Sequence, residues 1–227
     1  MISREMLDFL KELANNNTRE WFHANKKRYQ LIRKEYEQFV AHLIGEIATF
    51  DESVKNLHPK DCIFRINRDI RFSNDKSPYK TNFGAYITPG GRKAGFAGYY
   101  FHVEPGNSFV AGGIYRPPAD RLKAIRTEIY ENTGDFKEII EDPDFKEEFG
   151  SIYSDEKLKT APKGFPKDFE DIELLNYKDY TVLKPLTDDM LTSDELVEEV
   201  IRAYQTLYPF NQFLNEAIAF HIEQHPG

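Results

Sequence analysis

Cysteine is nearly absent from this sequence, since Cys62 is the only one among 227 residues. A single thiol excludes an internal disulfide and the paired-cysteine spacing of structural zinc sites. Uninterrupted apolar runs of about eighteen residues are missing too, which argues against a membrane-spanning helix. The charged N-terminus also lacks the apolar core of a secretory signal. We therefore expect a cytoplasmic protein with no membrane partner.

The motifs of the common enzyme classes are also missing. The chain contains no GxSxG, HExxH or DxDxDG motif and no dinucleotide-binding glycine pattern. Its glycine-rich stretch, TPGGRKAGFAG, lacks the GxxxxGK[ST] spacing and is not followed by a helical pattern. We interpret that stretch as a hairpin loop rather than a phosphate cradle, and the sequence indicates no cofactor.

Charge is distributed unevenly along the chain. The formal net charge is -8, but residues 131–199 contain 21 acidic and 8 basic residues, so the rest of the chain carries a net charge of +5. A nucleic-acid binder needs a broad basic face. The strongly acidic C-terminal half therefore predicts no nucleic-acid partner, and a local basic cluster favours a small anionic ligand.

Helical spacing of apolar residues marks both ends of the chain. We predict a short helix at about Arg4–Ala14 and a long one from Thr18, a suitable N-cap, to Phe50. Helical patterns return at residues 117–132, near 136–140 and 145–149, and in a final helix that Pro209 should kink or split.

Four short runs rich in aromatic and β-branched residues lie between about residues 62 and 115. They are CIFRIN, TNFGAYIT, GYYFHVEP and SFVAGGIY, and Glu104–Ser108 is typical of a hairpin turn. YTVLKPL, near residues 180–186, is expected at an edge because it contains Pro185. These patterns predict one α+β domain over residues 1–227, with a mostly antiparallel central sheet flanked by N- and C-terminal helices.

The two faces of the GYYFHVEP strand differ in character. Alternation directs Tyr99, Phe101 and Val103 to an apolar face, which the long N-terminal helix should cover. The opposite face then receives Tyr100, His102 and Glu104. The same alternation places Arg65 of the CIFRIN run on this second, polar and aromatic face.

Five cations gather in the stretch RINRDIRFSNDKSPYK, residues 65–80. Arginine holds phosphate or carboxylate oxygens through paired hydrogen bonds, and lysine adds a compact point charge. The candidate anion-binding residues are Arg65, Arg68, Arg71, Lys76, Lys80 and Tyr100. The alternative is a structural network in which the arginines pair with Asp69, Asp75 and Glu104.

His102 and Glu104 are the candidate catalytic residues. A histidine beside a carboxylate can act as a general base. Two residues on one strand face are an incomplete metal set, because a third ligand would have to come from His23 or His58. We therefore predict no metal site.

Several of these segments also carry a resemblance to a known family. NNTREWF, RINRDIRFSNDKSPYKTNFGAYI, GYYFHVEPGNSFVAGGIYRP, LKAIR and LKTAPKGFPKDFEDIELL occur in this order. Over about residues 5–215 the chain resembles the domain of unknown function 2461 family. The resemblance implies a single-domain, soluble, largely bacterial protein, and it implies no activity.

Three kinds of function remain open at this point. The protein can be an enzyme that holds an anionic substrate at the arginine cluster and moves a proton through His102 and Glu104. It can be a module that binds an anionic ligand or an acidic peptide without chemistry. It can also be a structural or interaction protein whose cationic cluster forms internal ion pairs.

Overall fold

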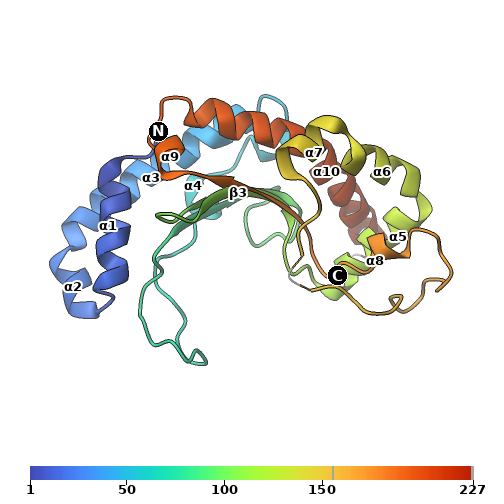
Figure 1. The fold of residues 1–227 in the computed structure, drawn as a ribbon, viewed down its shortest axis with the longest axis horizontal. Coiled ribbons are helices and arrows are strands. Elements are labelled where there is room, and N and C mark those ends of the chain that lie inside the picture. Colours follow the sequence, from blue (N-terminus) through green and yellow to red (C-terminus); the bar gives the residue numbers. More distant parts are fainter. Residues whose placement is uncertain (155, 226–227) are drawn as a thin grey trace. The chain divides into compact units, whose positions relative to one another are not determined.

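The computed structural model of the protein describes residues 1–154 and 156–225 (Figure 1). The chain packs as two compact units. Unit 1 contains residues 1–92, 100–110 and 185–202, and unit 2 contains residues 93–99, 111–184 and the chain from 203 onward. Within these described ranges no helix combines the length and the apolar character needed to cross a membrane.

The helices and strands follow the chain in a simple order. Unit 1 contains α1 (Arg4–Asn15), α2 (Arg19–Ala24), α3 (Lys26–Ile47), the 3-10 helix η1 (Glu52–Val54), α4 (Pro59–Cys62), β1 (Phe83–Ile87) and α9 (Asp188–Leu191). Unit 2 contains α5 (Ala119–Glu131), α6 (Thr133–Glu141), α7 (Pro143–Phe149) and α8 (Ile172–Leu175). Residues of β2 (Gly98–Val103), β3 (Ser108–Ile114), β4 (Tyr180–Leu186) and α10 (Leu196–Gln224) belong to both units.

The N-terminal helices begin at the caps that the sequence provides. The Ser3 hydroxyl accepts a hydrogen bond from the Met6 N–H at the start of α1, and the Thr18 hydroxyl accepts one from the Trp21 N–H at the start of α2. The long helix predicted from Thr18 to Phe50 is wrong in one respect, because it breaks at Asn25. There the Asn25 side-chain amide donates to the Trp21 carbonyl at 2.9 Å, which closes α2 before α3 begins.

The antiparallel sheet has the strand order β1-β2-β3-β4, which confirms the predicted fold class and places β4 at an edge. The CIFRIN run is not one of its strands, contrary to expectation. Residues 63–68 hydrogen-bond to residues 78–84 only at intervals, for example from the Arg68 N–H to the Pro78 carbonyl at 2.9 Å. The ladder is interrupted because Pro78 has no N–H to donate in return.

Helix α3 covers the apolar face of the sheet in unit 1, as predicted. Phe101 and Val103 are fully buried. The rings of Phe39 and Phe101 lie 5.0 Å apart, and the Tyr36 hydroxyl donates to the Phe101 carbonyl at 3.3 Å. The buried aromatic layer leaves the other face of β2 as the place where polar side chains can gather.

Two further expectations concern the turns and the last helix. Gly106, with a φ of 75°, and the bond from the Asn107 N–H to the Glu104 carbonyl form the predicted hairpin turn between β2 and β3. Pro209 does not split the final helix, the second of the two alternatives predicted for it, since α10 continues from Leu196 to Gln224. The buried rings of Phe136, Phe145 and Phe210 pack together in unit 2, which gives this part of the helix a large apolar contact.

Candidate functional site

Three polar side chains form a hydrogen-bonded chain along the outer face of β2. The Tyr100 hydroxyl lies 2.9 Å from Nδ1 of His102, and Nε2 of His102 lies 3.4 Å from Oε2 of Glu104. Because a carboxylate only accepts, we place the imidazole proton on Nε2 and the tyrosyl proton on the bond to Nδ1. Alternation along a strand is the whole reason that residues 100, 102 and 104 share one face.

Neighbouring side chains fix the positions of His102 and Glu104. Phe109 of β3 stacks on the His102 ring at 4.5 Å, with the two planes 11° apart. Thr81 donates to Oε1 of Glu104 at 2.9 Å, and Asn107 donates to Oε2 at 3.0 Å. His102 is 8% exposed, so its imidazole is fixed by a ring on one side and by hydrogen bonds at both nitrogens.

The environment sets the protonation of the three groups. Burial raises the pKa of Tyr100 to about 12, with a smaller contribution from the charge of Glu104. Burial also lowers the pKa of His102, against the opposing effect of Glu104, so the imidazole is neutral near pH 7. Burial alone would raise the pKa of Glu104, but hydrogen bonds from Asn107, Thr81 and His102 outweigh it and lower that pKa. The result is a neutral histidine between a phenol and a carboxylate.

An aromatic ring with two nearby cations adjoins the tyrosine. The Phe64 ring meets the Tyr100 ring edge-on at 6.2 Å. Lys80 Nζ lies 5.1 Å from the centre of the Phe64 ring, and the Arg92 guanidinium carbon lies 5.9 Å from it. Phe64 therefore occupies the position beside Tyr100 that we expected for Arg65, and Arg65 is exposed.

Lys80 and Arg65 differ from Arg68 and Arg71 of the same stretch. Neither makes an ion pair with a carboxylate in the part of the chain that the structure describes. Burial lowers the pKa of Lys80, and the positive charge of Arg65 lowers it further. The charge of Lys80 in turn lowers the pKa of His102. Lys80 thus lies within electrostatic range of His102, whereas Arg65 lies within electrostatic range of Lys80 and Asp69.

The remaining arginines of the cluster have acidic partners in the same loop. Arg68 is paired with Asp75, and Arg71 donates to both carboxylate oxygens of Asp69, at 2.9 and 2.7 Å. The Arg71 pair holds the pKa of Asp69 below its usual range. The hydroxyl and N–H of Ser77, and then Arg68, do the same for Asp75.

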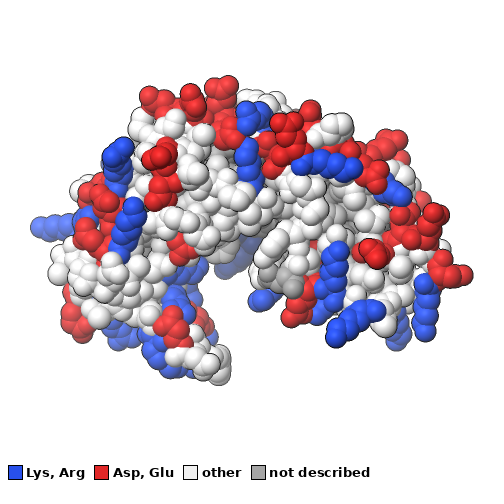
Figure 2. Space-filling view, in the orientation of Figure 1, with Lys and Arg blue, Asp and Glu red and all other residues white. Residues whose placement is uncertain are grey.

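The loop that carries these ion pairs projects from unit 1 and appears as the teal segment of Figure 1. In Figure 2, blue atoms gather on it. The ammonium of Lys76 donates to the Ile70 carbonyl at 3.1 Å, also within the loop. The structure therefore divides the predicted cluster into a self-paired loop and two cations, Lys80 and Arg65, that make no ion pair within residues 1–154 and 156–225.

Sequence reasoning missed the residues that shape the site from its edges. Phe64 and Phe109 lie in the CIFRIN and SFVAGGIY runs, where the pattern predicts only strand residues. Arg92 lies in the glycine-rich stretch, which we interpreted as a hairpin loop. Gly84 was also missed, although a Cβ built there would lie 2.6 Å from the Tyr100 hydroxyl oxygen. A glycine within an aromatic strand is a recognisable signal of close approach, and it was available in the sequence.

Metal ligation was tested on the geometry. Among residues 1–154 and 156–225, no group of three or more His, Cys, Asp or Glu side chains is placed to hold a metal ion. His102 and Glu104 are instead engaged with each other.

The fold and this face define an α+β protein whose antiparallel sheet carries hydrogen-bonded Tyr100, His102 and Glu104, with Lys80 close enough to influence the histidine. The chain matches, over residues 5–213, the family described as conserved hypothetical protein (DUF2461), and it belongs to that family. No curated protein and no solved structure matches it. The resemblance inferred from the sequence motifs is thus confirmed.

Proposed function

We propose that the protein binds a small ligand bearing a phosphate or carboxylate group at Lys80 and Arg65, and that His102 exchanges a proton with this ligand through Tyr100. The observation that carries the proposal is the position of Lys80. Its half-buried ammonium lies over Phe64, next to Tyr100, and it makes no ion pair within the described residues. Partly burying an uncompensated charge is costly, and an anion would relieve that cost.

The proton chemistry follows from the order of the hydrogen bonds. A neutral His102 can accept the tyrosyl proton at Nδ1 while its Nε2–H is held by Glu104, which is the charge state a general base requires. Tyr100, with its raised pKa, is a proton donor near pH 7. The ligand would then give its proton to the Tyr100 oxygen while the tyrosyl proton passes to Nδ1 of His102. The ligand loses one proton and the imidazole gains one. On this proposal the protein is an enzyme.

A binding module without chemistry, or a purely structural protein, is the second candidate. The ion pairs of Arg68 with Asp75 and of Arg71 with Asp69 favour it, because they neutralise two of the predicted anion ligands. We therefore narrow the proposed anion ligands to Lys80 and Arg65, with Tyr100 as a neutral donor. Arg68, Arg71 and Lys76 are then residues of the loop rather than of the site.

Thermal unfolding in the presence of phosphate or sulfate tests the binding step. The melting temperature of the wild type should rise across millimolar anion concentrations, since a ligand that binds only the folded state stabilises it. Lys80→Met should remove that rise. Lys76→Met is the matched control, because it makes the same chemical change on the exposed loop and should leave the rise unchanged.

Each outcome decides between the candidates. A wild-type melting temperature that ignores both anions, or a full rise in Lys80→Met, rejects the anion site. If the rise is present and His102→Gln leaves both its size and its pH dependence unchanged, His102 does not exchange a proton with the ligand. The non-catalytic module is then the better description.

We also propose a cytoplasmic, bacterial setting and no nucleic-acid partner. The single cysteine, buried at Cys62, supports a reduced compartment, and burial raises the pKa of its thiol to about 11. The net charge of -13 over residues 131–199 supports a small ligand rather than a polyanion.

A further inference from the structure

The loop at residues 68–78 ends in an unusually exposed aromatic side chain. Phe72 is 96% exposed, more than any other large apolar side chain in the described chain. Among the residues that the structure describes, its one ring contact is with the neighbouring Arg71, whose guanidinium carbon lies 5.9 Å from the ring centre. Residues 68–78 contain three cations and two aspartates, a net charge of +1, and Arg68 and Arg71 are paired with those aspartates. The tip is therefore an apolar side chain on a loop with a small net positive charge.

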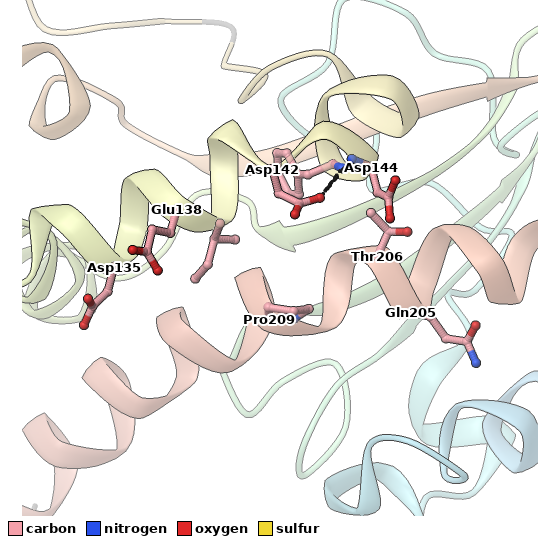
Figure 3. Close-up of a pocket in the computed structure, with 9 residues that line it drawn as sticks. Asp135, Glu138, Asp142, Asp144, Gln205, Thr206 and Pro209 are labelled. Carbon is pink, nitrogen blue, oxygen red and sulfur yellow. Dashed lines mark hydrogen bonds between the residues drawn. The ribbon is translucent and has the colours of Figure 1, made fainter.

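Unit 2 contains a groove lined by apolar and acidic side chains. It has a volume of about 470 Å³ and lies between α6 and α7 on one side and α10 on the other (Figure 3). Ile139, Phe145 and Pro209 line it with apolar atoms. The acidic residues that line it are Asp135, Glu138, Asp142 and Asp144. A volume of this size is within the range of ligand sites, and the lining combines apolar area with a carboxylate rim.

Pro209 interrupts the hydrogen bonding of α10 beside the groove. A proline inside a helix has no N–H, so it cannot donate to the carbonyl of the residue four positions earlier, which is Gln205. Gln205, Thr206 and Pro209 are the residues of α10 that line the groove.

We propose that the Phe72 loop of one copy of this protein docks into the acidic groove of a second copy. The aromatic ring would pack on Ile139 and Phe145, and the surrounding cations would face the carboxylate rim. The groove lies in a segment, residues 131–199, with a net charge of -13, and the loop lies in the part of the chain with a net charge of +5. This charge segregation attracts opposite parts of two copies and steers their encounter.

Loop and groove are different surfaces, so a single contact leaves a free loop on one copy and a free groove on the other. A second, reciprocal contact between the same two copies closes a two-fold dimer, and contacts with further copies produce a ring or an open chain. The contact is small and charged, and the association should be weak and sensitive to salt.

Sedimentation velocity of the full-length protein, from micromolar to millimolar concentration, tests the proposal. The wild type should form species larger than the monomer, and these should dissociate at high salt. Phe72→Ser and Glu138→Lys should each weaken association about tenfold or more, since an anchoring aromatic and a rim charge are removed. Phe220→Ser is the control, because Phe220 is 60% exposed and belongs to neither surface.

Mixing the two variants gives the sharpest result. Phe72→Ser keeps an intact groove and Glu138→Lys keeps an intact loop, so the mixture should form a dimer that neither variant forms alone, and growth should stop there. A wild type that stays monomeric at millimolar concentration overturns the proposal. So does association that Phe72→Ser leaves unchanged, or a mixture that fails to pair. Unchanged circular dichroism of each variant confirms that folding is intact.

Discussion

Gly84 of β1 and Tyr100 of β2 face each other so closely that a Cβ on Gly84 would lie 2.6 Å from the Tyr100 hydroxyl oxygen. The same Cβ would lie 3.2 Å from two carbons of the tyrosine ring. The absence of a side chain at residue 84 is thus what allows Tyr100 to lie flat against β1 and to reach His102. The position of these hydrogen-bonded side chains therefore depends on a residue that makes no hydrogen bond to them through a side chain.

Gly84→Ala should therefore displace Tyr100 and break its bond to His102. We expect a loss of about 1–3 kcal/mol in the free energy of unfolding, as for other overpacked sites, measured by urea denaturation. The double variant Gly84→Ala, Tyr100→Phe removes the closest contact and should recover part of the loss. Gly45→Ala is the control: a Cβ there meets nothing within 4 Å, and alanine should stabilise α3 by about 0.5–1 kcal/mol.

His102 should make stability depend on pH in a defined direction. Burial lowers its pKa in the folded state, so below about pH 6.5 the unfolded chain binds a proton that the folded chain does not. The stabilisation is complete above about pH 6.5 and is lost as the pH falls from there through the folded-state pKa. Urea unfolding at a series of pH values should show this decline in the wild type and not in His102→Gln. The exposed His42, changed to Gln, should leave the decline in place.

Gly113 of β3 should tolerate no side chain. It has a φ of 90°, and a Cβ would overlap the backbone carbonyl oxygen of Tyr180. Gly150 has a φ of 72°, and nothing lies within 4 Å of a Cβ built there. Alanine at residue 150 therefore measures the cost of the positive φ without a steric contact. We expect a loss of about 1–2 kcal/mol for Gly150→Ala and a loss roughly 1–3 kcal/mol greater for Gly113→Ala. Equal losses in thermal or urea unfolding would show that the steric contact is absent.

The hydroxyl of Tyr36 should contribute measurably to the attachment of α3 to the sheet. It donates to the Phe101 carbonyl at 3.3 Å in a fully buried setting. Tyr36→Phe should reduce the free energy of unfolding by about 0.5–1.5 kcal/mol, the usual net value of such a bond. Tyr130→Phe, at a 37% exposed position, should change it little. A larger effect at Tyr130 than at Tyr36 would contradict the buried bond.

The sequence was sufficient for the parts of the fold that follow periodic patterns. Alternation in GYYFHVEP correctly placed Phe101 and Val103 on one face of the sheet and His102 on the other, because successive side chains of a strand point to opposite faces. Turn residues predicted the hairpin at Gly106, and Pro185 predicted the edge position of β4. Cap chemistry correctly located the start of α2 at Thr18. Each of these features depends on residues a few positions apart.

The errors have a common physical origin in interactions that periodicity does not encode. The helix break at Asn25 results from a side chain that bonds back to Trp21, and nothing in the apolar spacing signals it. The CIFRIN run has strand propensity, but its pairing segment contains Pro78. The division of the basic cluster depends on which aspartate each arginine reaches, and residues 65–80 contain enough of both to allow many pairings.

The hydrogen bond from the Arg68 N–H to the Pro78 carbonyl has a consequence for engineering and for natural variation. It closes the neck of the loop, so the two ends stay together whatever lies between them. Lengthening a closed loop is inexpensive, at about 0.6 kcal/mol for each doubling. Extra residues can therefore be inserted near Phe72 without disturbing the sheet, which makes this tip a suitable graft point for an epitope or a fluorescent label.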